Sequence, residues 1–350
     1  MSELTPHYHW VIPSAHPVSE ATIEDAKRRG LSARALRVLS RRGPVDPAEL
    51  AARFDEPRAG LHDPSLLPDA SLVRERVDAA RRAGESVMVL GDFDADGLTG
   101  LAILTLALRR LGLSVEPYVP DRTGEGHGLS RAAVEHASSS GRGLIITADT
   151  GSTSVAEIAA ARAAGIDVIV TDHHVLAPER PVAVALVNAQ RPDSDYPDSR
   201  LSGAGMAFKV AQLLLAEEPG GPEEALALAD LAAVGSIADV VPILGENRSI
   251  VRLGLAQLEQ APRPGLAALM ANARIERDAV STDDIAFGLA PRINAMGRIG
   301  DPSVAARLLL APDQATAEDL AAQLETANKR RRELTTEAMA EARERLAAQP

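Results

Sequence analysis

Three groups of polar residues in this sequence have the types and positions that binding of metal ions requires. Each group directly follows a short apolar run: Asp92, Asp94 and Asp96 follow 87–90, Asp149 follows 144–148, and Asp172, His173 and His174 follow 168–171. Three carboxylates within five residues at the end of a buried segment need a compensating positive charge. Carboxylate oxygens favour hard divalent cations, and imidazole nitrogens add further ligands. The pattern indicates a site for two divalent metal ions.

The spacing of the first group also resembles the calcium-binding loop of an EF-hand, which begins Asp-x-Asp-x-Asp-Gly. The twelfth residue of such a loop is a bidentate Glu. Counted from Asp92, the twelfth residue here is Ile103, and the preceding residues 86–90 read as a strand instead of a helix. The EF-hand interpretation is therefore excluded.

The segments around the three groups alternate between strands and helices. Strands are expected at 86–91, 115–119, 144–148, 168–171 and 182–187, and helices at 97–111, 130–140 and 155–164. This alternation is typical of βαβ units and predicts an α/β fold in which helices flank a parallel sheet. The carboxyl ends of parallel strands share one edge, where open α/β folds place their sites. We therefore expect the three polar groups to meet there.

The rest of the chain reads as helical and suggests three regions. Residues 1–80 form a helical N-terminal region, with helices at 21–29, 46–53 and 74–83. We expect residues 81–310 to form the domain that carries the polar groups. Its sheet lies within 86–190, and its helical part at 200–310 contains helices 205–216, 222–238, 249–260 and 264–273. Residues 315–350 hold one long helix, at 316–347, which we expect to connect to a further domain that this sequence lacks.

Composition limits the classes of function. The 350 residues contain no cysteine, which excludes disulfides, thiolate zinc sites and cysteine nucleophiles. No apolar run is long enough for a membrane span and no secretory signal is visible, so we expect a cytoplasmic protein. The net charge of −12 disfavours a polyanionic ligand, but metal-binding carboxylates contribute to that sum and a local basic groove would suffice. Aromatic residues make up only 2%, too few for extensive stacking on bases.

The motifs resemble the DHH phosphoesterase superfamily, which is named for the tripeptide at 172–174, and within it the RecJ family. The matching metal motifs are 91–100 (Gly-Asp-Phe-Asp-Ala-Asp-Gly-Leu-Thr-Gly), 144–151 (Leu-Ile-Ile-Thr-Ala-Asp-Thr-Gly), 171–174 (Thr-Asp-His-His) and 233–242 (Ala-Val-Gly-Ser-Ile-Ala-Asp-Val-Val-Pro). Segments 124–129, 201–209 and 291–298 are similar to RecJ segments in the same order. The resemblance runs from about His62 to the final helix.

The resemblance implies a particular set of metal ligands. Asp149 would bridge two ions, Asp94 would bind one of them, and Asp96, His173 and Asp239 would surround the other. His174 would face the scissile phosphate or complete a metal shell. Superfamily members often carry a metal-binding His four residues before Asp94. That position is Leu90 here, and Asp92 is the further ligand expected to compensate for the missing His. The mixture of carboxylate and imidazole suits Mn²⁺, with Mg²⁺ as the abundant substitute.

Contacts to substrate phosphate are expected from residues outside the metal motifs. The candidates are Arg292, Asn294 and Arg298, the helix start at Ser202 and Gly203, and Arg122. Arginine forks and helix N-termini both bind phosphate oxygens. Packing is the alternative explanation for each candidate. The basic run 329–332 reads as a solvated helix face, and His127 stands where the family often has Tyr.

The RecJ resemblance implies an exonuclease that degrades single-stranded DNA from the 5′ end in recombination and repair. The expected partners are single-stranded DNA, a single-strand-binding protein and a RecQ-type helicase, at work in the nucleoid of a bacterial cytoplasm. One alternative is a phosphodiesterase for nano-RNA or cyclic dinucleotides, but those proteins generally lack the 291–298 segment and the helical N-terminus. A second is a catalytically inactive replication scaffold, which the intact metal motifs disfavour.

Overall fold

The computed structural model describes residues 11–122 and 124–347, which fall into two compact units divided between Gly60 and Leu61. The first unit holds three helices, α1 (Glu20–Arg28), α2 (Ala33–Arg42) and α3 (Pro47–Phe54). Each begins after a residue whose side chain accepts a hydrogen bond from the first helical turn: Ser19, Ser32 and Asp46. A small core made by Ala26, Leu36, Val45 and Leu50 stabilises this unit.

Helix α4 (Ala70–Ala83) belongs to the second unit, although the sequence analysis assigned it to the N-terminal region. Val73 and Val77 on α4 are buried in the core beside the sheet. The Arg76 side chain donates to Asp167, at the start of β4, and to Glu85 before β1. These contacts are long-range, so local pattern could not reveal them. The division into three functional domains stays a prediction.

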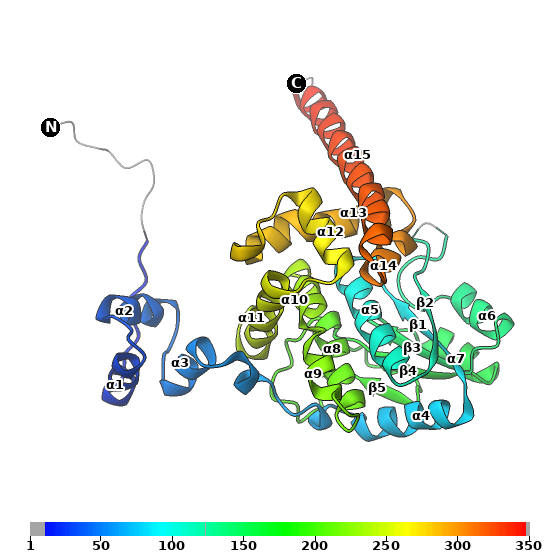
Figure 1. Cartoon of the computed structure of the whole chain (residues 1–350), viewed down its shortest axis with the longest axis horizontal. Coiled ribbons are helices and arrows are strands. Elements are labelled where there is room, and N and C mark those ends of the chain that lie inside the picture. The colour runs from blue at the N-terminus through cyan, green and yellow to red at the C-terminus, as the bar shows by residue number, and fades with distance from the viewer. Residues whose placement is uncertain (1–10, 123, 348–350) are drawn as a thin grey trace. The chain divides into compact units, whose positions relative to one another are not determined.

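The second unit is built on a five-stranded sheet in which all neighbouring strands are parallel, in the order β2-β1-β3-β4-β5. The strands are β1 (Ser86–Gly91), β2 (Ser114–Tyr118), β3 (Leu144–Ala148), β4 (Asp167–Thr171) and β5 (Ala185–Val187). Helices lie on both faces of the sheet (Figure 1). The predicted α/β fold with a flanked parallel sheet is confirmed.

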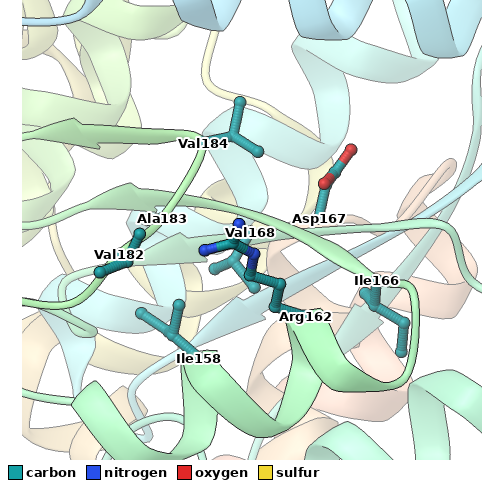
Figure 2. A pocket seen from close by; sticks show the side chains of 8 residues that line it. All are labelled: Ile158, Arg162, Ile166, Asp167, Val168, Val182, Ala183 and Val184. Atoms are coloured by element: carbon teal, nitrogen blue, oxygen red, sulfur yellow. The ribbon is translucent and has the colours of Figure 1, made fainter.

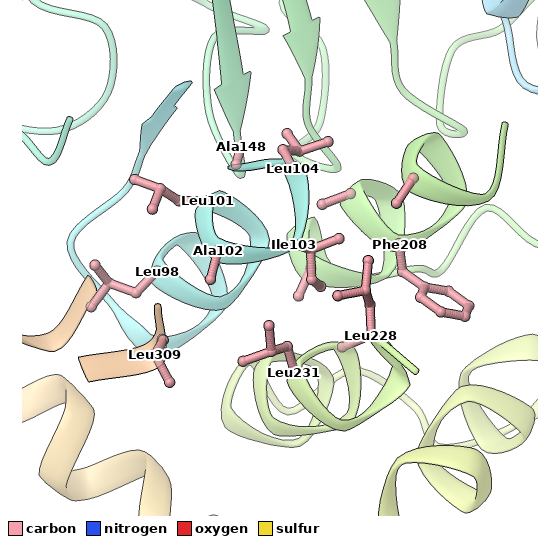
Figure 3. Close-up of a cluster of buried hydrophobic side chains, with 14 of the residues drawn as sticks. Leu98, Leu101, Ala102, Ile103, Leu104, Ala148, Phe208, Leu228, Leu231 and Leu309 are labelled. Carbon is pink, nitrogen blue, oxygen red and sulfur yellow. The ribbon is translucent and has the colours of Figure 1, made fainter. Parts of the chain in front are cut away.

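Alternation of side chains along the strands divides the core into two layers. Val87 and Val89 of β1 pack with α5 (Ala95–Arg110) and α8 (Gly203–Leu215). Met88 and Leu90 face the opposite side, against α6 (Arg131–Ser139) and α7 (Val155–Ala163). Successive strand residues point to opposite faces, so a continuous apolar run can fill both layers. Figure 3 shows part of the first layer, with Leu101 and Ile103 of α5 and Phe208 of α8 among its side chains.

Helices complete the second unit beyond the sheet. They are α9 (Gly221–Leu226), α10 (Ala229–Ala238), α11 (Gly245–Gln260), α12 (Pro264–Ala273), the π-helix Asp284–Leu289, α13 (Ala290–Ile299), α14 (Pro302–Leu309) and α15 (Gln314–Ala347). The buried residues of α15 all lie in its first half, and Figure 1 shows the second half extending beyond the neighbouring helices. Within the described ranges, no helix is long and apolar enough to cross a membrane.

The single helix expected at 222–238 is wrong, because the structure forms two helices, α9 and α10, separated by a turn at Ala227 and Leu228. Neither Gly nor Pro marks this break. Residues 229–237 are all buried, among α5, α8 and α11, whereas much of α9 lies at the surface. Tertiary packing of α10 against its neighbours therefore separates it from α9, against the local helical pattern.

A buried ion pair joins α8 to the start of α11. Lys209 Nζ lies 2.9 Å from Glu246 Oε1, and both side chains are fully buried. The Tyr196 hydroxyl donates to Glu246 Oε2 at 2.7 Å, and the His62 amide donates to Oε1 at 2.9 Å. Lys209 also donates to the His62 carbonyl and to Gln212. Full hydrogen bonding of this kind is what allows a charged pair to stay inside a core.

We predict that Lys209→Met lowers the free energy of unfolding by roughly 3–5 kcal/mol, because it leaves the Glu246 carboxylate buried without its counter-charge. The measurement is urea denaturation followed by circular dichroism. The double variant Lys209→Met/Glu246→Gln should recover part of the loss. The exposed pair of Arg345 and Glu341 supplies the control, since Arg345→Ala should change stability by no more than about 0.5 kcal/mol. Equal effects of Lys209→Met and Arg345→Ala would contradict the prediction.

Candidate metal centre

The three polar groups meet at the carboxyl edge of the sheet, as the parallel topology predicts. Asp92, Asp94 and Asp96 follow β1, Asp149 follows β3, and residues 172–174 follow β4. Asp239 reaches the same place from the end of α10, far along the sequence. Four separate elements therefore supply side chains to one site.

His173 stands at the centre of the site. Its Nε2 atom lies 3.1 Å from Asp149 Oδ1, 3.7 Å from Asp239 Oδ2 and 3.8 Å from Asp96 Oδ2. His173, Asp96 and Asp239 each offer a ligand atom within 4.8 Å of the others. This group combines one imidazole with two carboxylates, a donor set that suits a divalent transition metal.

A second group of ligand atoms shares the Asp149 side of the site. Asp92, Asp94 and Asp149 offer carboxylate oxygens within 4.8 Å of one another. Asp149 also forms a third group with His173 and His174. Asp149 thus lies between the all-carboxylate group and the histidines. The structure brings the predicted ligands together, with Asp92 beside Asp94, while the ligand assignment itself stays a prediction.

Two buried oxygen atoms show that the residues fit a bound cation. Asp149 Oδ1 and Asp92 Oδ1 are both removed from solvent and have no hydrogen-bond partner in the described residues. A buried carboxylate oxygen without a donor carries a full desolvation cost. A divalent ion satisfies such oxygens directly.

Asp96 is held by the amino end of α8. The Gly203 amide donates to Asp96 Oδ2 at 2.7 Å, and the Ala204 amide donates to Oδ1 at 2.9 Å. Glycine is required at two positions for this approach. A Cβ atom at Gly203 would lie 2.4 Å from Asp149 Cβ, and one at Gly235 of α10 would lie 2.6 Å from Asp96 Oδ1. The two glycines let the helices α8 and α10 reach the carboxylates.

Two residues of the site adopt a left-handed backbone. Asp149 has φ = +62°, and Val240, which directly follows Asp239, also has φ = +62°. Asp tolerates this region through local hydrogen bonding, but a β-branched residue is strained there. The Val240 side chain is 84% exposed, so packing does not hold it in place. The turn after α10 therefore stores strain next to Asp239.

Burial raises the pKa values of four carboxyl groups in the metal-free site, those of Asp92, Asp96, Asp149 and Asp239. Burial raises the pKa of Asp96 to about 6, with His173 opposing the shift and Asp239 adding to it. The pKa of Asp149 lies well above its usual value because of burial and the neighbouring Asp96 and Asp94. Burial also raises the pKa values of Asp92 and Asp239. The site therefore holds protons that a cation would displace.

His174 is bound to the buried Asp172 through Nδ1, at 2.8 Å from Asp172 Oδ1. This hydrogen bond raises the pKa of His174 to about 9. Burial alone would raise the pKa of Asp172, but His174 and the backbone amides of Ser152 and His174 lower it to about 2. The His174 side chain is 59% exposed. It can therefore present a positive charge to an anion at the mouth of the site.

The residues expected to bind phosphate have different surroundings. Arg292, Asn294 and Arg298 all lie on α13. Arg292 donates to Glu325 on α15 at 2.7 Å and to the Gly288 carbonyl, so its charge is already compensated. Asn294 Oδ1 accepts from the Ala95 amide at the start of α5. Arg298 is exposed, with no ion pair or hydrogen bond to residues 11–122 or 124–347, and is the member of this set best able to contact a ligand.

Ser202 and Gly203 have structural contacts in place of the expected phosphate site. Ser202 is fully buried, and its hydroxyl caps α8 by accepting from the Gly205 amide. The Gly203 amide is occupied by Asp96. The amides at the start of α8 already donate to a site carboxylate, and Ser202 and Gly203 are buried, which disfavours the predicted phosphate contacts; that assignment stays an untested prediction.

Arg122 and His127 lie on the loop after β2, beside the first carboxylate group. The Arg122 guanidinium lies over the Phe93 ring, 5.0 Å from its centroid. The His127 ring packs 4.5 Å from Phe93, and its Nδ1 atom is 3.6 Å from Asp92 Oδ2. Arg122 is exposed and next to the site, which keeps it a candidate for phosphate binding.

A separate hollow of about 290 Å³ lies at the amino end of β4, on the side away from the metal ligands. Its lining consists of Ile158, Arg162, Ile166, Asp167, Val168, Val182, Ala183 and Val184 (Figure 2). Asp167 is paired with Arg76. The hollow contains no histidine and no second carboxylate, so it has no chemistry comparable to that of the metal centre.

Two further residues at this edge of the sheet, Asn188 and Gln190, follow the last strand, β5, and were not among the predicted site residues. Asn188 is fully buried and donates to the His174 carbonyl at 2.9 Å. A polar residue directly after a fourth parallel strand was the available signal. An amide side chain has no acid–base or metal-binding chemistry that would mark it as a site residue in the sequence.

Comparison with known proteins gives a consistent assignment. Residues 86–236 match the DHH family, N-terminal domain. The chain is 39% identical over 306 residues to the single-stranded-DNA-specific exonuclease RecJ of Bacillus subtilis, covering 87% of this chain and 38% of that protein. It is 41% identical over 282 residues to the protein of the same name from Thermus thermophilus, covering 80% of this chain and 40% of that protein. The chain thus spans about two fifths of the length of these relatives.

Solved structures agree with the sequence matches. A crystal structure of exonuclease RecJ bound to manganese has a TM-score of 0.71 and 38% identity, covering 78% of this chain and 68% of that one. The Thermus thermophilus RecJ structure in complex with Mn²⁺ has a TM-score of 0.70 and 34% identity, covering 92% of this chain and 43% of that one. The parallel sheet, the order of the metal motifs and these similarities together lead to one conclusion: this chain belongs to the RecJ family of DHH phosphoesterases.

Proposed function

We propose that this protein is a two-metal-dependent exonuclease that hydrolyses phosphodiester bonds of single-stranded DNA from the 5′ end. The observation that carries the proposal is the convergence of Asp96, Asp149, His173 and Asp239 from four elements, with the Asp149 Oδ1 atom buried and without a hydrogen bond. Family membership supports the substrate, because the curated relatives are named single-stranded-DNA-specific exonucleases.

Two divalent ions, Mn²⁺ by preference or Mg²⁺, would be held by the two groups of ligand atoms that Asp149 connects. Asp92 and Asp94 would complete one group, and Asp96, His173 and Asp239 the other. When bound, the ions would lower the pKa of a water molecule and neutralise charge that develops on the phosphate. RecJ structures bound to Mn²⁺ and to Mg²⁺ support this choice of ions.

The protein's own residues would position the substrate and stabilise its charge. His174, protonated through its contact with Asp172, would donate a hydrogen bond to a phosphate oxygen. Arg122 and Arg298 are the exposed cations proposed to contact the DNA backbone. The backbone amides of Gly203 and Ala204 would keep Asp96 oriented, so that it needs no reorganisation during the reaction.

Partner proteins and a place in recombination and repair are further parts of this proposal. A single-strand-binding protein, a RecQ-type helicase and work in the bacterial nucleoid are proposed on family membership alone. A phosphodiesterase for nano-RNA or cyclic dinucleotides is the alternative activity at the same metal centre, and the family assignment disfavours it.

The substrate assignment predicts how labelled DNA is released. With Mn²⁺, the protein should release labelled mononucleotides early from a 5′-labelled single strand and late from a 3′-labelled one. Duplex DNA, short RNA and a cyclic dinucleotide should react at least about tenfold more slowly, because a site that selects one polymer loses roughly that factor for each missing good contact. Faster cleavage of short RNA or the cyclic dinucleotide would overturn the proposal, as would early release of the 3′ label.

The role proposed for Asp149 predicts opposite effects on activity and stability. Asp149→Asn should lower the cleavage rate and the Mn²⁺ affinity by more than roughly 100-fold, since it removes the shared carboxylate. It should leave the metal-free protein as stable or more stable, because Asn tolerates the left-handed backbone and carries no buried charge. Cleavage assays and thermal melts measure both. Asp319→Asn, at an exposed position on α15, should change neither; retained activity in Asp149→Asn would contradict the role.

The raised carboxyl pKa values predict a pH-dependent response to metal. Without metal, folded Asp96 keeps its proton up to about pH 6, above the unfolded value of 3.8, so its contribution to stability is complete at low pH and is lost as pH rises through about 6. Bound Mn²⁺ would compensate for this loss of stability, because it takes the place of the proton on the carboxylates. Mn²⁺ should therefore raise the melting temperature more at about pH 8 than at about pH 5, and EDTA should reverse the rise. A shift that is the same at both pH values would contradict this account.

A further inference from the structure

We propose that Asn188 and Gln190 are positioning residues that hold the His173–His174 segment in register with the Asp149 loop. The inference rests on the proposed function, because it concerns the geometry of the same metal centre. Neither side chain touches a proposed ligand atom directly. Both act on the backbone that carries the ligands.

Asn188 connects three segments from the interior of the protein. It directly follows β5 and is fully buried. Its Nδ2 atom donates to the His174 carbonyl at 2.9 Å and to Ser152 Oγ at 3.1 Å. Its Oδ1 atom accepts from the Gln190 amide at 2.9 Å. Both ends of the amide are therefore used, and the turn at 188–190 is tied to the loops after β3 and β4.

These contacts close a ring of hydrogen bonds around the base of the site. The Ser152 amide donates to Asp172 Oδ2 at 2.9 Å, and Asp172 Oδ1 accepts from the amide of His173 at 2.7 Å and from the ring of His174. The His174 carbonyl accepts a hydrogen bond from Asn188 Nδ2, which closes the ring. Ser152 and Asp172 are also buried, so water does not compete for these bonds.

Gln190 provides a second attachment to the same segment. Its side-chain amide donates to the His173 carbonyl. The carbonyl groups of the two successive histidines are thus held by two side chains from one turn, while Asp172 holds the amides of both residues. Gln190 lies at the surface, and its side chain contributes little to the core.

The consequence is a fixed separation between ligands that come from different strands. His173 Nε2 is 3.1 Å from Asp149 Oδ1, and the two residues sit on loops that Ser152, Asp172 and Asn188 link. Productive metal and catalytic sites are held to within about 0.5 Å by such supporting contacts. Loss of a supporting partner typically lowers metal affinity or activity by roughly 10–100-fold.

The test uses isosteric substitutions in the whole chain. Asn188→Asp keeps the acceptor for the Gln190 amide but replaces the donor to the His174 carbonyl with an oxygen. Gln190→Glu makes the same exchange opposite the His173 carbonyl at an exposed position. Asn328→Asp on α15 is the matched control. Asn328 is also buried, and its Oδ1 atom accepts hydrogen bonds from Arg331, an acceptor that aspartate retains. Mn²⁺ affinity is measured by the electron paramagnetic resonance signal of free Mn²⁺, beside thermal melts and cleavage of single-stranded DNA.

We expect Asn188→Asp to weaken Mn²⁺ binding by roughly 10–100-fold and Gln190→Glu by roughly 3–10-fold, with proportionate losses of cleavage, while Asn328→Asp matches the wild type. A residue with a purely structural role would change the melting temperature but not the Mn²⁺ affinity of the folded protein. If Asn188→Asp does not fold, Gln190→Glu decides. Mn²⁺ affinity within about twofold of the wild type in the folded variants would overturn the inference.

The same measurements separate this inference from the proposed function. A wild-type protein that binds Mn²⁺ but does not cleave single-stranded DNA contradicts the proposed substrate, and the affinities of the variants still decide the positioning role. A wild-type protein that cleaves DNA, with variants that bind Mn²⁺ equally well, contradicts the positioning role alone. A wild-type protein that binds no Mn²⁺ contradicts both.

Discussion

Crowding of carboxylates at one edge of a parallel sheet is the constraint on which the rest of this structure depends. Asp96 and Asp149 are almost completely buried, and Asp92 and Asp94 lie within ligand distance of Asp149. The N-termini of α5 and α8 offset part of this negative charge, because their backbone amides donate hydrogen bonds to Asp94 and Asp96. Asp92 Oδ1 and Asp149 Oδ1 are buried without a hydrogen bond, and a divalent cation would satisfy both, which makes the metal ions part of what balances this edge of the sheet.

The surrounding elements meet this constraint by close approach and by local strain. Gly203 and Gly235 allow α8 and α10 to contact the carboxylates where any Cβ atom would clash. Asp149 and Val240 take left-handed conformations beside the proposed ligands. Such features cost stability, and they persist because the packed core of α5, α8 and α10 determines where these backbones lie. The inner side of the site is buried, while His174, Arg122 and Arg298 leave charge accessible on its outer side.

Hydrogen-bonded amides complete the arrangement. Backbone and side-chain amides bind Asp96 and Asp172 directly and the histidines through their carbonyl groups. Asn294 similarly ties α13 to the start of α5, and Arg292 is directed toward Glu325 on α15. Residues of the 291–298 segment thus join the last helices to the start of α5, where the first carboxylates lie, which gives that segment a structural role whatever its role toward DNA.

The sequence by itself indicated the strands, their parallel arrangement and the convergence of Asp94, Asp96, Asp149 and His173 at the carboxyl edge, while the order of the strands came from the structure. These follow from local apolar runs and from the geometry of βαβ units, which depend on neighbouring residues. Asp239 entered only through resemblance, because nothing local marks it. Tertiary structure alone decided the split between α9 and α10, the burial of Ser202 and Gly203, the pairing of Arg292 with Glu325, and the supporting place of Asn188. Each of these depends on partners distant in sequence, whose approach is set by packing and which no local pattern records.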